Sequence, residues 1–147
     1  MLLAIDCGNT NTVFSIWDGA RFLATWRTST DQTRTADQYF VWLSALMKAQ
    51  GNDVPITEAI ISSTVPRVVF NLRVLCNRYY NCRPLVVGRP DCLLPVAVRV
   101  DPGTNVGPDR LVNTVGAFDL CGGDLIVVDF GTRSEERRVG KECTLRC

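Results

Sequence analysis

The chain has 147 residues, of which 46% are hydrophobic and 21% are charged, and its formal net charge is +1. This balance is typical of one globular domain with a hydrophobic core, and it excludes an intrinsically disordered chain. The near-neutral charge gives no general attraction to nucleic acid or to an anionic membrane, and no apolar run approaches the roughly 18 residues of a membrane-spanning helix.

The first third of the chain predicts an antiparallel start. Residues 2–5 are expected to form a buried strand, and residues 8–11 a tight turn. Strands over residues 12–17 and 21–27 follow, joined by Asp18-Gly19, a dipeptide that favours a β-hairpin. The chain begins without the basic segment of a secretory signal, so we expect a cytoplasmic protein.

Helices and strands are then predicted to alternate. Thr35 is expected to cap a helix, with Gln38 completing a capping box and Gly51 just past the helix end. The residues expected on its inward face are Tyr39, Trp42, Leu43, Leu46 and Met47. A strand over residues 58–63 precedes a second helix that begins at Pro66. The apolar face of that helix is expected to carry Val69, Leu72, Cys76 and Tyr79.

Beyond the second helix, short strands are expected at residues 85–87 and 96–100, followed by a loop over residues 101–108. A third helix is expected from near Asp109 to just before Gly122-Gly123. The residues expected to face the core are Leu111, Val115 and Phe118. A last strand is expected at residues 125–129. Strands that alternate with helices after an antiparallel start indicate an α/β layered domain.

Two segments repeat one pattern, AIDCGNT at residues 4–10 and VVDFGT at residues 127–132. Each is an apolar run that ends in aspartate and continues with glycine and threonine. Glycine lets the main chain approach an anion, while amide and hydroxyl groups donate to phosphoryl oxygens. The repetition predicts a duplicated nucleotide-binding fold with two phosphate loops that face each other.

In the first loop we expect Asp6 to hold Mg²⁺ through water, because Mg²⁺ gives up its hydration shell reluctantly. The residues expected to surround the phosphates with donors are Gly8, Asn9, Thr10 and Asn11. An ordinary hairpin turn is the alternative, since these residue types also favour turns. The pattern G-x-x-x-x-G-K-[ST] is absent, which excludes a P-loop NTPase.

A second candidate site is Gly107-Pro108-Asp109-Arg110, at a predicted helix start that favours anions. Asp109 could accept the proton of an attacking hydroxyl, and Arg110 could bind a substrate carboxylate. A capping aspartate beside a solvated arginine is the alternative. The chain has no histidine, which leaves carboxylates as the natural proton acceptors. The seven cysteines form no C-x-x-C pair, so neither a zinc site nor a disulfide framework is indicated.

Five segments, in the order DCGNTNTVF, RTADQY, ISSTVP, VGPDRLVN and VVDFGT, resemble type III pantothenate kinases. These enzymes are a branch of the actin, sugar kinase and Hsp70-like superfamily. The resemblance covers residues 1–132 and implies a ribonuclease H-like (actin-like ATPase) fold with a mixed sheet and flanking helices. Residues 1–124 would form the first subdomain, and residues 125–132 the first strand and phosphate loop of a truncated second subdomain.

The resemblance implies ATP-dependent phosphorylation of pantothenate to 4′-phosphopantothenate, the first step of coenzyme A biosynthesis. It also implies a homodimer that uses Mg²⁺ and either K⁺ or NH₄⁺. The ATP-binding positions would be Asp6, Cys7, Gly8, Asn9, Thr10, Asn11, Thr12, Val13 and Thr132. The pantothenate-binding positions would be Gly107, Pro108, Asp109 and Arg110, with Asp109 as the proton acceptor. Asp129 would ligate the monovalent cation.

Two positions depart from the family pattern. Pro108 stands where alanine or another small aliphatic residue is more usual, and Val100 stands where many members present a tyrosine. The later adenosine-binding segments are missing, so the chain by itself is expected to be inactive. Two other functions stay open: a superfamily kinase that acts on a sugar or a short acid, and a non-catalytic accessory factor for transcription.

Residues 133–147, RSEERRVGKECTLRC, abandon the apolar periodicity and carry five basic and three acidic side chains. Their first eleven residues look like the translation of a sequencing adapter. We therefore expect a non-native tail after Thr132, with a genuine charged helix as the alternative.

Overall fold

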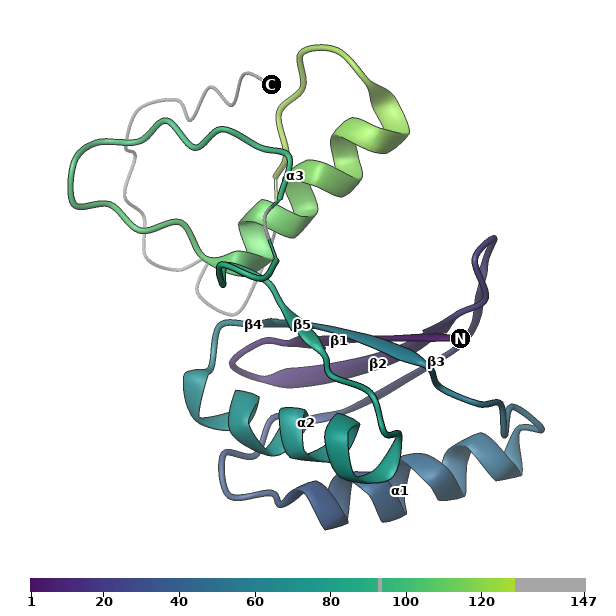
Figure 1. Ribbon diagram of the computed structural model, residues 1–147. Coiled ribbons are helices and arrows are strands. Elements are labelled where there is room, and N and C mark those ends of the chain that lie inside the picture. Colours follow the sequence, from purple (N-terminus) through teal and green to yellow (C-terminus); the bar gives the residue numbers. More distant parts are fainter. Residues whose placement is uncertain (93, 129–147) are drawn as a thin grey trace.

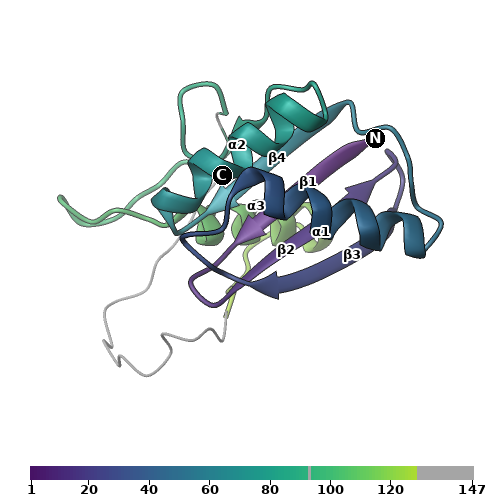
Figure 2. The same cartoon turned by 90° about the horizontal axis from the view of Figure 1, so that it is seen from below.

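The computed structural model describes residues 1–92 and 94–128. The strands are β1 (Leu2–Cys7), β2 (Asn11–Trp17), β3 (Phe22–Ser29), β4 (Glu58–Ser63) and β5 (Leu85–Val86). The helices are α1 (Ala36–Ala49), α2 (Pro66–Tyr79) and α3 (Pro108–Cys121). Helices α1 and α2 cover one face of the sheet, and α3 lies on the opposite face (Figures 1 and 2).

The five strands form one mixed sheet in the order β3-β2-β1-β4-β5. Strand β1 lies at its centre, antiparallel to β2 and parallel to β4. The β2–β3 pair is antiparallel, and β4–β5 is parallel. Helix α2 supplies the crossover that a parallel pair requires. The predicted α/β class and antiparallel start are confirmed.

The hydrophobic core lies between the sheet and helices α1 and α2. Because side chains alternate along a strand, β1 sends Leu3, Ile5 and Cys7 into this core and the residues between them to the other face. The main buried residues from the other elements are Phe14, Ile16, Tyr39, Leu43, Met47, Ile61, Val68, Leu72 and Leu75. The sheet is therefore stabilised chiefly from one side.

The predicted start and end of α1 and the predicted start of α2 are confirmed. The side chain of Thr35 accepts from the N–H of Gln38, and the Gln38 side chain accepts from the N–H of Thr35, which completes the capping box. Gly51 follows the helix with a φ of 68°, the left-handed conformation that glycine tolerates. Pro66 occupies the first turn of α2, where the missing N–H costs no helical hydrogen bond.

Three predictions about the later part of the chain are wrong. Residues 96–100 and 125–128 form no strand, because no neighbouring strand among the described residues offers them a hydrogen-bonding partner. Helix α3 forms as predicted but has no buried residue along its length, so Leu111, Val115 and Phe118 do not enter the core. Residues 129–147, with Asp129, Thr132 and the expected tail, lie outside the described residues.

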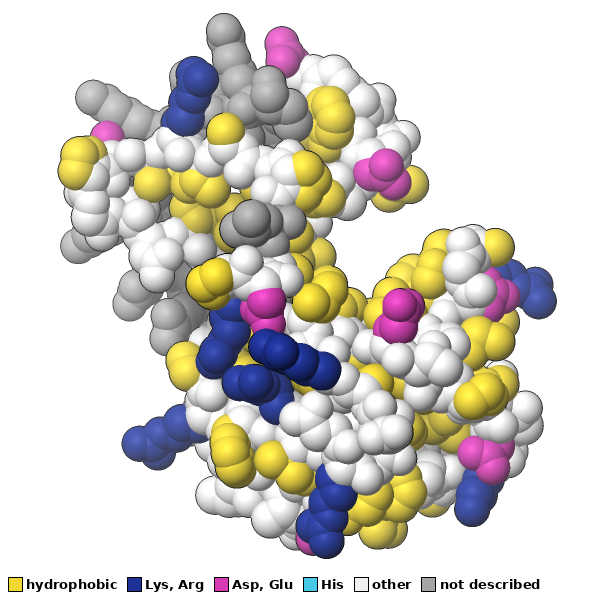
Figure 3. All heavy atoms as spheres, viewed as in Figure 1, with side chains coloured by type: hydrophobic (Ala, Val, Ile, Leu, Met, Phe, Trp, Pro, Cys, Tyr) yellow, Lys and Arg dark blue, Asp and Glu magenta, His cyan; other side chains and the backbone are white. Residues whose placement is uncertain are grey.

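The second face of the sheet is sparsely covered. Helix α3 contacts β4, and hydrophobic side chains remain at the surface in this part of the molecule (Figure 3). Phe118 is 43% exposed and Ile126 is 92% exposed. Within the described ranges, no helix is both long and apolar enough to cross a membrane.

Candidate functional site

The first candidate loop joins β1 to β2 as a tight hairpin. The N–H of Gly8 donates to the carbonyl of Asn11 at 2.9 Å, which closes the turn. Asn9, Thr10 and Asn11 are exposed, as is Asp6 at the end of β1. The amide of Gly8 thus serves the turn itself, and the remaining predicted donors of this loop lie at the surface.

Backbone carbonyls of this loop are held by donors from two other segments. The carbonyl of Cys7 accepts from the N–H of Thr64 at 3.0 Å. Thr30 donates twice, from its N–H to the carbonyl of Thr10 at 2.8 Å and from its hydroxyl to the carbonyl of Gly8 at 2.7 Å. Thr30 lies in none of the sequence patterns, and Thr64 lies in the ISSTVP segment without a role assigned to it. The available signal was their position, since each follows shortly after the end of a strand.

Buried polar side chains lie beneath the loop. Cys7 and Thr12 are both 0% exposed, and the Thr12 hydroxyl lies 3.3 Å from the Cys7 sulfur and 2.9 Å from the Thr30 hydroxyl. Tyr39 is also fully buried, and this burial raises the pKa of its phenol. The side chains of Cys7 and Thr12 therefore support the loop from below and do not face solvent.

Asp6 lies on the sheet face that carries α3. Its neighbours Ile5 and Cys7 point into the core, so the alternation of the strand directs Asp6 to the opposite face. In the parallel register Asp6 stands beside Ser62 of β4, and β4 is the strand that α3 contacts. The structure thus places Asp6 and α3 on the same face of the sheet.

The second candidate motif forms the start of α3. Gly107 is the N-cap, and its carbonyl accepts from the N–H groups of Arg110 at 3.2 Å and Leu111 at 3.3 Å. A β-carbon at Gly107 would collide with Oδ1 of Asp109. The Asp109 carboxylate is therefore folded back over the helix N-terminus. Asp109 is half-buried, whereas Arg110 is exposed.

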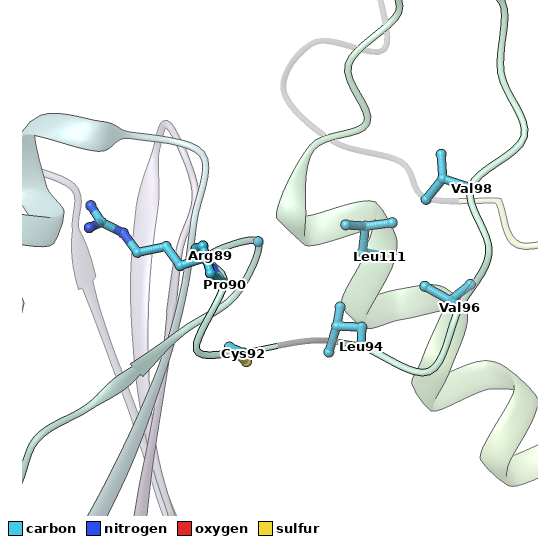
Figure 4. A pocket seen from close by; sticks show the side chains of 8 residues that line it. Arg89, Pro90, Cys92, Leu94, Val96, Val98 and Leu111 are labelled. Atoms are coloured by element: carbon cyan, nitrogen blue, oxygen red, sulfur yellow. The ribbon is translucent and has the colours of Figure 1, made fainter.

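An apolar hollow of about 420 Å³ adjoins this helix start. Its lining residues are Gly88, Arg89, Pro90, Cys92, Leu94, Val96, Val98 and Leu111. Figure 4 shows Leu94, Val96 and Val98 gathered near Leu111, while the guanidinium group of Arg89 points away from them. Residues 94–98, expected in part as a strand, instead line the apolar hollow beside the start of α3.

The candidate metal ligands of the two motifs are isolated carboxylates in the part of the chain that the structure describes. The described part of the chain contains no group of three or more His, Cys, Asp or Glu side chains that could hold a metal ion. A single exposed carboxylate such as Asp6 suits a hydrated divalent ion that is held mainly by its phosphate ligands. Asp129, the predicted ligand of a monovalent cation, lies outside the described ranges.

Comparison with known proteins places these features in one family. Residues 2–140 match the family model described as type III pantothenate kinase. The relative from Roseobacter denitrificans with that name is 77% identical over 132 residues, which cover 90% of this chain and 51% of the relative. Those from Cereibacter sphaeroides and Paracoccus denitrificans are 76% and 72% identical, each with the same coverage.

The chain spans about half the length of the curated relatives it matches. Among solved structures, one of a 2-dehydro-3-deoxygalactonokinase from Sinorhizobium meliloti is 20% identical with a TM-score of 0.33, over 44% of this chain and 21% of that chain. Overlap at that level carries no argument about fold. The match to the family model over residues 2–140 and the high identity of the relatives show that the chain belongs to the type III pantothenate kinase family.

Proposed function

We propose that this chain is the N-terminal half of an enzyme that transfers the γ-phosphoryl group of ATP to the primary alcohol of pantothenate. The observation that carries the proposal is that Asp6 and α3 lie on the same face of the sheet, in a chain that belongs to this kinase family. Phosphoryl transfer depends mostly on positioning and on charge stabilisation, and a carboxylate base is sufficient for it.

The nucleotide side is assigned to residues 6–13. The exposed turn of Asn9, Thr10 and Asn11 would face the phosphates, while Cys7 and Thr12 would hold the turn from below. Asp6, exposed at the end of β1, would hold hydrated Mg²⁺. The ion, when bound, neutralises charge on the phosphates. Thr132 and Asp129 would complete this side, with K⁺ or NH₄⁺ at Asp129.

The acceptor side is assigned to the start of α3. Asp109 would take the proton of the attacking hydroxyl, and Arg110 would bind the carboxylate of pantothenate in a fork geometry. The apolar hollow lined by Leu94, Val96 and Leu111 would accept the aliphatic part of the substrate. Family membership alone supports the proposal that the complete protein is a cytoplasmic homodimer.

The proposal is tested with a hybrid enzyme, in which residues 1–132 are joined to the C-terminal half of the Roseobacter denitrificans relative. Circular dichroism first establishes that the hybrid enzyme is folded. It should then convert ATP and pantothenate to ADP and phosphopantothenate, whereas the 147-residue chain alone should show no turnover. A hybrid enzyme that phosphorylates a sugar or a short hydroxy acid in preference to pantothenate would contradict the assignment.

A further inference from the structure

We propose that Thr30 is a positioning residue that turns two backbone carbonyls of the β1–β2 loop away from the nucleotide. The inference rests on the proposed function, in which this loop binds the phosphates of ATP. Thr30 directly follows β3, at the edge of the sheet, and neither the loop motif nor the α3 motif includes it.

Thr30 donates hydrogen bonds to two backbone carbonyls of the turn. Its hydroxyl donates to the carbonyl of Gly8, and its N–H donates to the carbonyl of Thr10. In a planar trans peptide the C=O and the following N–H point in opposite directions. Holding these carbonyls toward Thr30 therefore directs the N–H groups of Asn9 and Asn11 away from Thr30.

This orientation determines what the loop can bind. A carbonyl oxygen turned toward a phosphate would repel it, whereas backbone N–H groups that point outward can donate to an anion. The carbonyl of Asn11 is also engaged, since it accepts from the N–H of Gly8. The carbonyls of Gly8, Thr10 and Asn11 thus all accept hydrogen bonds from protein donors. Their oxygen atoms therefore point toward the protein.

The hydroxyl of Thr30 is itself held in place. It lies 2.9 Å from the hydroxyl of Thr12, which is fully buried. The Thr12 hydroxyl also contacts the sulfur of Cys7, at 3.3 Å. The loop is therefore connected through Thr30 and Thr12 to the core beneath α1.

A matched pair of substitutions separates the hydroxyl from the shape of the side chain. Thr30→Val keeps the backbone donor and the branched shape but removes the hydroxyl, whereas Thr30→Ser keeps both donors. Thr25→Val is the control on β3, the strand that Thr30 follows, because the Thr25 hydroxyl bonds to Ser15 at 3.0 Å in an exposed position. All three are made in the hybrid enzyme and in the 147-residue chain.

In the hybrid enzyme, Thr30→Val should raise KM for ATP by about 10-fold, the change expected for the loss of one such hydrogen bond, with KM for pantothenate unchanged. Thr30→Ser and Thr25→Val should stay close to the unmodified hybrid enzyme. In the 147-residue chain, Thr30→Val should speed hydrogen exchange at the Gly8 amide, and Thr25→Val should not.

The outcomes distinguish the two proposals. If Thr30→Val leaves KM for ATP unchanged in an active hybrid enzyme, the role of Thr30 is refuted while the kinase assignment stands. If the folded hybrid enzyme has no activity toward pantothenate, the proposed function fails. Hydrogen exchange at the Gly8 amide in the 147-residue chain then tests whether Thr30 sets the loop geometry. An unchanged exchange rate in Thr30→Val would refute that role as well.

Discussion

The carboxylate of Asp109 occupies the space that a β-carbon at Gly107 would need. The absence of a side chain at Gly107 is thus what allows the proposed base to fold back over the start of α3. The crowding involves the end of a flexible side chain and not the backbone, so an added methyl group would move the carboxylate and leave the helix intact.

Gly107→Ala should therefore reduce activity without reducing stability. In the hybrid enzyme we expect kcat to fall by between about 10-fold and 100-fold, since a misplacement of about 1 Å at a reacting group can have that effect. Gly116→Ala is the matched control on the same helix, because a β-carbon there meets nothing within 4 Å. Equal kcat values for the two variants would show that the position of Asp109 is not set by Gly107.

Asp109→Asn tests the base itself. Asparagine has nearly the same shape but cannot accept the proton of the alcohol, so kcat should fall by roughly 10²–10⁴-fold. Steady-state kinetics of the hybrid enzyme measure the effect, and the thermal unfolding curve should not change. A variant with the parent kcat would remove Asp109 from the mechanism.

Gly8→Ala tests how closely a ligand approaches the first loop. The nearest atom to a β-carbon at Gly8 is the Asn11 carbonyl oxygen at 3.5 Å, an ordinary contact, so the variant should fold normally. The added methyl group would stand where the phosphates approach the backbone. We expect KM for ATP to rise on the order of 10-fold, with KM for pantothenate as the internal control. A rise in KM for pantothenate alone would contradict this assignment.

Thr35→Ala tests the capping box of α1. The substitution removes the side-chain acceptor for the N–H of Gln38, which should lower the free energy of unfolding by about 1 kcal/mol. Chemical denaturation of the 147-residue chain measures the loss. Thr35→Ser keeps the acceptor and should restore most of the stability. Equal losses in the two variants would show that the hydroxyl is not responsible.

The chain should lose stability at alkaline pH. Burial raises the pKa of Cys76 from 9.0 to about 12 and that of Tyr80 from 10.0 to about 12. The unfolded chain releases these protons first, so the folded state binds more protons above pH 9 and stability falls as pH rises from about 9 toward 12. Below pH 9 these two groups should have no effect.

Denaturation curves between pH 8 and pH 11 test this expectation, with Cys76→Ala as the variant that lacks the thiol. Its stability should fall less steeply between pH 9 and pH 10 than that of the parent. A parent whose unfolding free energy is constant up to pH 11 would show that these groups titrate normally in the folded state.

Local patterns were enough to predict the first two-thirds of the fold. The capping residues Thr35 and Gln38 located the start of α1, and Pro66 located the start of α2. Each signal depends only on neighbours in the chain. The β-branched segment 58–63 was likewise predicted with the bounds that β4 has in the structure.

The failures concern elements that need distant partners. Residues 96–100 and 125–128 have apolar runs suited to strands, but a strand forms only where another strand can pair with it. The helical period of α3 was read correctly, yet periodicity does not show whether a second layer is present to cover the helix. Thr30 was missed because its role depends on carbonyls some twenty residues earlier in the chain.

The exposed surface of α3 has a consequence for mutational tolerance. Because none of its residues is buried against the described part of the chain, replacements along this helix should change the stability of the 147-residue chain little. The β1–β2 turn, linked to the interior through Thr12 and Thr30, should tolerate replacements far less well.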